Sequence, residues 1–326
     1  MENEEIFKTR VDLSGLKESV DKVKSEISKI IVGQEKMVEL LITAVLADGH
    51  VLLEGVPGVA KTLTAKLLSK VIQAGFSRVQ FTPDLMPSDV LGTSVFNVKT
   101  SEFTFKQGPI FSNIILIDEI NRAPAKTQSA LFEVMEERQA TVDGQTYPMD
   151  EPYLVVATQN PIEQEGTYRL PEAQLDRFLF KISVDYPGLE EEVEVLKGHH
   201  ARQDVHDLSS VEPVLDKDMI KDYRTKVHGL HVDENLMRYI AQIVNETRNS
   251  PDLYLGASPR ASIAILQTAK AFAGIQGRDF ITPEDIKFVA NPVMRHRVIL
   301  TPEKEMEGQT ADSIIDMIVE KIEVPR

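Results

Sequence analysis

The stretch from residue 51 to residue 62 constrains the fold of this chain more than any other feature. A short apolar run at 51–53 is followed by Gly55-Val56-Pro57-Gly58-Val59-Ala60-Lys61-Thr62, and a helical pattern occupies 63–71. A strand, a glycine-containing loop, a Lys-Thr pair and a helix in this order predict a phosphate-binding loop. Backbone N–H groups and the positive end of the helix dipole would face phosphate oxygens, Lys61 would neutralise the β- and γ-phosphates, and Thr62 would ligate Mg²⁺.

Ala60 departs from the usual pattern, which has glycine immediately before the lysine. A methyl group is tolerated there if the residue already has the backbone angles of the following helix, so we expect Ala60 to be helical. The alternative, a glycine-containing turn before an ordinary helix, is disfavoured because strand, loop, Lys-Thr and helix all occur in order. By itself the loop indicates nucleotide binding and no particular reaction.

A pair of acids follows the apolar run at 114–117, and its second member distinguishes between reactions. Asp118 would hold Mg²⁺ through water, and Glu119 would activate the attacking water as general base. Such a pair could equally begin a solvated loop, but a phosphate-binding loop earlier in the chain favours the metal and base roles. A kinase should avoid activating water, so Glu119 indicates hydrolysis.

The local sequence does not decide the roles of three further polar residues. Asn160 follows the apolar run at 154–157, where open α/β sheets bind ligands, and would position the lytic water or contact the γ-phosphate; a turn asparagine before Pro161 is an equal alternative. Arg177, before the apolar run at 178–184, and Arg260, at the start of a helical pattern, could be ordinary surface arginines. Spacing cannot show that an arginine reaches a neighbouring subunit's nucleotide.

Five short apolar runs, at 51–53, 79–81, 114–117, 154–157 and 178–184, alternate with helical patterns and predict a parallel sheet of the α/β class covered on both faces. Two hairpins should leave this sheet: one pairs 95–98 with 103–105, and the other pairs 140–142 with 145–147 around Asp143-Gly144. Pro187 and Gly188 mark a break, so we predict a core at 1–186 and a helical domain at 187–326. Helices are expected at 16–31 and 35–46 in the first part, and at 190–202, 217–227, 233–248, 259–273 and 283–289 in the second, with no further strand.

Composition excludes several classes of protein. The chain of 326 residues has no cysteine, which excludes disulfides, thiolate metal sites and thiol nucleophiles. A net charge of −15 opposes broad attraction to nucleic-acid phosphates. The pair His199-His200 is read as a solvated helix end and not as a metal site. Neither a membrane-spanning run nor a signal-peptide pattern is visible, so a cytoplasmic location is expected.

Taken together, these stretches resemble the MoxR family of AAA+ ATPases over nearly the whole chain. The resemblance is carried by Ile31-Val32-Gly33-Gln34, the phosphate loop with its alanine, Gln80-Phe81-Thr82-Pro83-Asp84-Leu85-Met86-Pro87-Ser88-Asp89, Asp118-Glu119-Ile120-Asn121-Arg122-Ala123, Ala157-Thr158-Gln159-Asn160-Pro161 and Leu175-Asp176-Arg177-Phe178. It implies an AAA+ P-loop core with a central five-stranded parallel sheet, two hairpin insertions like those of magnesium-chelatase ATPase subunits, and a C-terminal all-helical lid. Within this family Ala60 is no longer a departure.

The resemblance also implies roles for individual residues. Asn160 would be sensor 1, Arg177 an arginine finger acting on the adjacent subunit, and Arg260 sensor 2. The nucleotide-binding set would comprise Val32, Gly33, Gln34, Gly55, Val56, Pro57, Gly58, Val59, Ala60, Lys61, Thr62 and Leu63, with residues 31–34 near the adenine. Thr62 and Asp118 would serve the metal, so the implied cofactors are ATP and Mg²⁺.

An ATP-hydrolysing ring that remodels partner proteins is therefore the leading hypothesis. The family is usually hexameric, often works with proteins that carry a von Willebrand factor A domain, and would turn its hairpins towards the pore or the client. One alternative is a nucleotide-dependent binding switch with negligible turnover. Another is a DNA-remodelling ATPase, which the charge disfavours because the first hairpin offers only Lys99 and Lys106 as cations.

Overall fold

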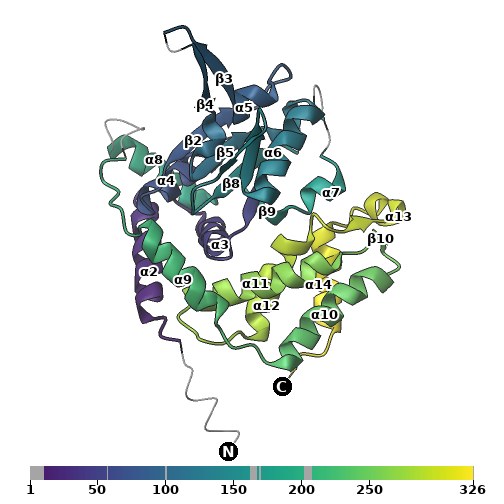
Figure 1. Cartoon of the computed structure of the whole chain (residues 1–326). Coiled ribbons are helices and arrows are strands. Elements are labelled where there is room, and N and C mark those ends of the chain that lie inside the picture. The colour runs from purple at the N-terminus through teal and green to yellow at the C-terminus, as the bar shows by residue number, and fades with distance from the viewer. Residues whose placement is uncertain are drawn as a thin grey trace, which may run out of the picture.

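A five-stranded parallel sheet organises the first half of the chain (Figure 1). The computed structural model describes residues 11–325, except 57, 100, 162–166, 169 and 202–207. The strands are β1 (His50–Gly55), β2 (Phe76–Gln80), β5 (Ile114–Asp118), β8 (Leu154–Gln159) and β9 (Phe178–Val184), in the order β2-β5-β8-β1-β9. All four neighbouring pairs are parallel, so the prediction of an α/β parallel sheet is confirmed.

Helices cover both faces of this sheet because its strands are apolar on both sides. In β5, Ile114 and Leu116 join one hydrophobic cluster, whereas Ile115 and Ile117 join a second cluster on the opposite face. The first cluster contains side chains of α3 (Glu35–Leu46) and α4 (Lys61–Val71), and the second contains side chains of α6 (Ala125–Glu137). Burial on both faces follows from the period-two alternation of side chains along a strand.

Both predicted hairpins form outside the main sheet. They are β3 (Gly92–Asn97) with β4 (Glu102–Gln107), and β6 (Gln139–Val142) with β7 (Gln145–Pro148). Asp143 and Gly144 have positive φ values of 51° and 78°, as a type I′ turn requires. The rings of Phe105 and Tyr147 stack with centroids 4.4 Å apart, which ties the two hairpins together. In Figure 1 the β3–β4 hairpin projects away from the body of the sheet.

The second half of the chain is mainly helical, and all five of its predicted helices are present. They are α8 (Leu189–Ala201), α9 (Lys217–His228), α10 (Glu234–Asn249), α11 (Pro259–Ile275) and α12 (Pro283–Met294). Helices α13 (Pro302–Met306) and α14 (Ala311–Lys321) were not predicted. The expectation that no strand follows residue 187 is wrong, since β10 (Leu253–Leu255) and β11 (Ile299–Leu300) form an antiparallel pair. Strands of two or three residues are too short to show alternation in a sequence.

Helix α2 (Ser14–Ser28), the first in the described part of the chain, packs against both halves. It places the Ser19 hydroxyl 3.0 Å from the hydroxyl of Tyr223 in α9, and the Tyr223 hydroxyl donates to the Gly15 carbonyl. Leu16, Val20 and other buried side chains of α2 belong to the same cluster as α3 and the lid helices. The core of the sheet domain and the core of the helical part are therefore continuous through α2.

Short helical turns complete the described structure: α5 (Pro87–Leu91), α7 (Glu172–Leu175) and two 3₁₀ turns, η2 (Pro109–Phe111) and η3 (Ile120–Arg122). β9 ends at Val184 and α8 begins at Leu189, on either side of the predicted boundary at 186/187. Within the described ranges, no helix combines the length and apolar character needed to cross a bilayer.

Candidate active site

The carboxyl ends of β1, β2, β5 and β8 meet around a cavity of about 370 Å³. Eight of the predicted site residues line it: Gly58, Ala60, Lys61, Thr62, Leu63, Asp118, Glu119 and Asn160. They come from three strand-to-loop junctions that are far apart in the sequence, and the parallel direction of the strands brings them to one edge of the sheet. The remaining lining residues are Arg78, Gln80 and Thr158.

The phosphate loop leaves β1 at Gly55 and enters α4 at Lys61. A β-carbon on Gly55 would lie 2.5 Å from the carbonyl oxygen of Val184, so the close approach of β9 requires glycine there. Gly58 has φ +92° with open space where a side chain would be, which leaves its backbone accessible from the cavity side. Pro57, one of the predicted binding residues, lies outside the described residues, and Val56 and Val59 pack against the hydrophobic core.

The backbone conformation of Ala60 differs from the helical conformation that we expected. Its φ of 60° and ψ of 16° place it in the left-handed region and not in the right-handed helical region we expected. The residue caps α4 from this conformation, because its carbonyl accepts the first helical hydrogen bond, from Thr64 N at 2.9 Å. The tight turn from the loop into the helix therefore imposes the unusual angles, at a cost of about 1–2 kcal/mol for a residue with a β-carbon.

Lys61 is directed back into its own loop. Its Nζ donates to the Gly55 carbonyl at 2.5 Å, across the loop. Partial burial lowers the pKa of Lys61, while the charges of Asp118, Glu119 and Glu54 act in the opposite direction. The Lys61 ammonium group is therefore placed to bind phosphate oxygens. Their negative charge would stabilise the positive charge of this partly buried group.

Asp118 is buried, and both of its carboxylate oxygens have partners. Oδ1 accepts from the Thr158 hydroxyl at 3.2 Å, and Oδ2 accepts from Arg78 Nε at 2.6 Å. Thr62 lines the same cavity, so a hydroxyl and a carboxylate are available as hard oxygen ligands. This donor set fits Mg²⁺, which commonly takes one or two protein groups and completes its shell with water and phosphate oxygens.

Glu119 adopts a left-handed conformation with φ 58°, directly after β5. Its Oε2 accepts from Gln80 Nε2 at 2.9 Å and forms an ion pair with Arg122, whose Nε lies 2.9 Å away. Its backbone N–H donates to the Thr158 hydroxyl at 3.0 Å, and that hydroxyl also donates to Asp118. Thr158 thus fixes the two acids relative to each other, and Gln80 and Arg122 hold the glutamate side chain at the cavity wall.

Arg177 and Arg260 lie at the opposite edge of the sheet. They line a second cavity of about 280 Å³, together with residues that precede β1 and β9. Arg177 Nη1 donates to the Phe132 carbonyl at 2.5 Å, and Arg260 lies 3.5 Å from Glu136 and 3.9 Å from Asp176. The structure therefore brings these two arginines to each other and not to the phosphate loop of the same chain.

The separation follows from the register of β9. Val184, the last residue of β9, pairs with Gly55, whereas Arg177 precedes the first residue of the strand. Seven residues of extended strand span about 23 Å, which no arginine side chain bridges. Neither a finger role for Arg177 nor a sensor role for Arg260 can therefore be exerted on this chain's own nucleotide in this conformation.

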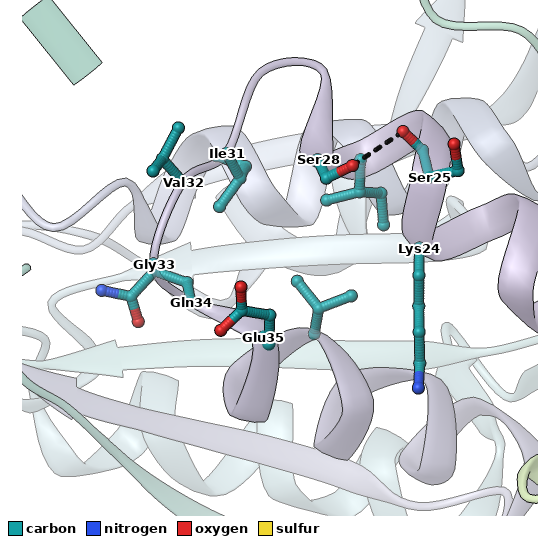
Figure 2. A pocket seen from close by; sticks show the side chains of 10 residues that line it. Lys24, Ser25, Ser28, Ile31, Val32, Gly33, Gln34 and Glu35 are labelled. Carbon is teal, nitrogen blue, oxygen red and sulfur yellow. Dashed lines mark hydrogen bonds between the residues drawn. The ribbon is translucent and has the colours of Figure 1, made fainter. Parts of the chain in front are cut away.

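The loop that the family resemblance places near adenine lies between two cavities. Figure 2 shows Ile31, Val32, Gly33 and Gln34 beside a cavity of about 310 Å³, with Lys24, Ser25 and Ser28 of α2 also lining it. On the other side of the loop, another cavity of about 320 Å³ extends from Gly33 and Gln34 towards the end of β9 and Arg295 of the lid. Gly33 has φ +72°, and Gln34 Nε2 donates to the Asp185 carbonyl at 3.2 Å. The loop is thus fixed against the end of β9.

Sequence reasoning assigned no role to Arg78, Gln80, Arg122 and Thr158, although all four contact Asp118 or Glu119. For Arg78 and Gln80 the sequence did contain a signal. Arg78 and Gln80 are two residues apart in β2, hence on one face, and Gln80 pairs in register with Asp118. Recognising that signal requires knowing that β2 lies next to β5, which the sequence pattern does not reveal.

Comparisons with known proteins agree with this architecture. A model of the ATPase family associated with various cellular activities (AAA) matches residues 50–180, and a model of an AAA lid domain matches residues 245–318. The uncharacterised Bacillus subtilis protein YeaC is 47% identical over 93% of this chain and 94% of its own length. The Mycobacterium tuberculosis protein named Chaperone MoxR1 is 43% identical over 92% of this chain and 81% of its own. A crystal structure from Cytophaga hutchinsonii matches with a TM-score of 0.88 and 43% identity, covering 95% of this chain and 96% of that one.

Proposed function

The chain belongs to the MoxR family of AAA+ ATPases, and we propose that it hydrolyses ATP at the interfaces of a ring of identical subunits. The observation that carries this proposal is the convergence of Lys61, Thr62, Asp118, Glu119 and Asn160 on one cavity. Lys61, Thr62 and Asp118 would be sufficient to bind a nucleotide with Mg²⁺. A carboxylate and an amide beyond them, where the γ-phosphate would lie, serve hydrolysis.

Each of these residues has a definable task in the reaction. Thr62 and Asp118 would hold Mg²⁺, whose charge would offset the negative charge that develops in phosphoryl transfer. Glu119 would accept a proton from the water that attacks the γ-phosphorus, after its carboxylate is released from Gln80 and Arg122. Asn160 would orient that water or the γ-phosphate, and Lys61 would stabilise the transferring phosphoryl group.

A ring would bring Arg177 and Arg260 to a nucleotide, which a single chain in this conformation does not do. Arg177 and Arg260 lie on the edge of the sheet opposite the phosphate loop, about 23 Å from it along β9. A neighbouring copy that faces this edge with its own nucleotide would receive both arginines, and repetition of such a head-to-tail contact closes into a ring. The family resemblance favours six subunits.

A protein client is the proposed target of the ring. The hairpin β3–β4 exposes several apolar side chains, among them Phe96 at 49%, Val98 at 82% and Phe103 at 74%, and the ring centroids of Phe96 and Phe103 lie 5.1 Å apart. Apolar side chains grouped in this way on a surface are typical of a protein-interaction site. The relative from Mycobacterium tuberculosis is named a chaperone, which supports a protein-remodelling role. Because family members often act with proteins containing a von Willebrand factor A domain, a protein of that class is the proposed client. We place the ring in the cytoplasm.

Substitution Glu119→Gln tests the hydrolytic mechanism. The amide retains the size of the side chain but cannot accept the proton of the attacking water, so turnover should fall by a factor of about 10²–10⁴ while ATP binding persists. Phosphate release and binding of a fluorescent ATP analogue measure the two properties. Glu133→Gln, at an exposed position of α6, is the matched control and should retain both. Unchanged phosphate release by the Glu119 variant would refute the assigned role.

Substitution Arg177→Ala tests the ring. The variant should bind ATP as the unaltered protein does and lose turnover by a factor of about 10³ or more, because an arginine finger acts only on the transition state. Turnover per subunit of the unaltered protein should rise with protein concentration as rings assemble. Turnover independent of concentration, in both proteins, would contradict catalysis between subunits.

The binding-switch and DNA-remodelling alternatives make different predictions. A switch would show saturable ATP binding and negligible phosphate release at every protein concentration. A DNA-remodelling ring would show phosphate release that DNA stimulates. The net charge of −15 disfavours the second alternative.

A further inference from the structure

We infer that Arg297, in the lid, is a positioning residue that fixes Arg177 for its action on the neighbouring subunit. This inference rests on the proposed function, in which Arg177 acts between subunits. Arg297 lies just beyond the end of α12, and 120 residues of chain separate it from Arg177. It lines the same cavity as Arg177 and Arg260 but is not itself presented to solvent, since its side chain is 4% exposed.

All five N–H groups of the Arg297 guanidinium have acceptors, and four of them hold the backbone or side chain on either side of Arg177. Nε donates to Asp176 Oδ1 at 2.6 Å, and Nη2 donates to the Asp176 carbonyl at 3.1 Å and to the Phe178 carbonyl at 2.7 Å. Nη1 donates to the Leu179 carbonyl at 3.2 Å and to the carbonyl of Val293 in α12. The residue before Arg177 and the two residues after it are thereby fixed by a single planar group.

The neighbouring histidine reinforces this attachment. His296 is buried, and its Nε2 lies 2.9 Å from the Phe178 carbonyl, the same oxygen that Arg297 contacts. Burial lowers the pKa of His296 well below its ordinary value, so the ring is neutral and carries its proton on Nε2 to donate to that oxygen. Two consecutive lid residues therefore converge on the peptide group that joins Phe178 to Leu179.

Arg177 itself has few constraints of its own. Among the residues that the structure describes, its guanidinium has one hydrogen bond, to the Phe132 carbonyl, and its backbone N–H donates to Gln174 O at 3.2 Å. The direction of its side chain therefore depends on the placement of the backbone from Asp176 to Leu179, which Arg297 fixes. Misplacing a catalytic group by about 1 Å can cost about 10²-fold in rate, so loosening this segment should be visible in turnover.

Lysine cannot replace Arg297 in this arrangement. An ammonium group offers three donors on one atom, whereas the planar guanidinium spans five acceptors that face it from different directions. Arg297→Lys keeps the buried positive charge next to Asp176 but loses the hydrogen bonds to the carbonyls of Phe178 and Leu179. Arg297→Met removes the charge as well and leaves Asp176 with Arg260 at 3.9 Å.

Subunit mixing distinguishes positioning of Arg177 from a general structural role. Arg297→Met and Arg297→Lys are each expected to lower phosphate release by about 10²-fold in rings of one variant, with unchanged affinity for a fluorescent ATP analogue. Each is then mixed in equal amounts with Glu119→Gln, which cannot hydrolyse ATP but carries an intact Arg177 and Arg297. Random mixing pairs a competent nucleotide site with a competent arginine at about one interface in four, so about a quarter of the unaltered activity should return.

Two controls make the outcomes separable. Arg177→Ala mixed with Glu119→Gln must be rescued in the same way if catalysis occurs between subunits. Arg278→Lys alters an arginine that pairs with Asp285 inside the lid and does not reach the core, and it should retain activity in rings of its own.

Rescue of the Arg177 and Arg297 variants alike supports the inference. If Arg177→Ala is rescued and neither Arg297 variant is, then Arg297 acts on its own subunit and the inference is overturned while the proposed function stands. If Arg177→Ala is not rescued, catalysis between subunits fails, and the inference fails with it. Full activity of rings made only of Arg297→Met would overturn the inference directly. Should Arg297→Met fail to assemble, the charge-retaining Arg297→Lys decides by the same criteria.

Discussion

Replacing Ala60 by glycine is expected to stabilise the chain, against the usual effect of such a substitution. Ala60 has φ 60° and ψ 16° at the start of α4. A β-carbon in that region costs about 1–2 kcal/mol, and glycine avoids the cost. Glycine in turn increases the entropy of the unfolded chain, which lowers stability by about 0.4–1 kcal/mol. The difference between the two effects is a net gain of about 0.5–1 kcal/mol.

Thermal unfolding of the nucleotide-free protein measures this gain. An increase of this size should raise the midpoint by about 2 °C, given the length of the chain. Ala241→Gly is the matched control, because Ala241 is exposed in the interior of the right-handed helix α10. There the same change should destabilise by about 1 kcal/mol. The two substitutions are chemically identical and should have opposite signs.

Hydrolysis by the Ala60→Gly variant should be retained, because the substitution leaves every backbone N–H of the phosphate loop in place. A lower melting midpoint for this variant, in the same direction as Ala241→Gly, would refute the reasoning. It would mean that Ala60 is not held in the left-handed region in solution, and that the turn from Gly58 into α4 has a different form.

Three further predictions concern other parts of the chain. Burial lowers the pKa of His50 to about 3, below its ordinary 6.5, so the unfolded state binds the proton first and stability falls as pH drops through that window. Between pH 6.5 and 5 the contribution of His50 is a loss of about 2 kcal/mol in urea unfolding, which His50→Gln should remove, whereas the contribution of buried His296 remains in both proteins; an unchanged pH slope in the variant would contradict this. Gly33→Ala should destabilise by about 1–2 kcal/mol in thermal unfolding, since φ is +72° and the new carbon would lie 2.4 Å from the Glu191 carboxyl carbon; full stability would exclude the strain. Arg78→Met should lower the Mg²⁺ concentration for half-maximal hydrolysis by up to about fivefold, because Arg78 no longer competes for Asp118; an unchanged Mg²⁺ titration would argue against that competition.

The sequence predicted the main elements of the fold because most of them carry strong periodic signals. The apolar runs of β5 and β8 are continuous, and β9 was placed at its exact bounds, since buried parallel strands contain little else. The turn Asp143-Gly144 was predictable from its dipeptide alone. Helix α14 and strands β10 and β11 were missed, because their boundaries are set by packing within the lid and not by local composition.

The sequence identified individual residues of the candidate site but not the contacts between their side chains. Lys61, Thr62, Asp118 and Glu119 were identifiable because their spacing relative to strands and helices is a local property. The left-handed angles of Ala60 were not, since they arise where the loop must turn sharply to enter α4. Side-chain partners such as Arg78 depend on strand order, which a single sequence does not encode in any local pattern.

The opposite placement of Arg177, in contrast, follows from strand direction once the sheet is known to be parallel. Lys61, Glu119 and Asn160 each follow a strand, whereas Arg177 precedes one. In a parallel sheet, residues that follow strands lie at one edge and residues that precede strands lie at the other. A residue at the second edge is excluded from the nucleotide of its own chain by the length of β9, whatever its rotamer. The order of Arg177 and β9 in the sequence is therefore itself an argument for catalysis between subunits. Arg297 hydrogen-bonds to Asp176 and Phe178 at the same end of β9, so it too lies far from the phosphate loop of its own chain.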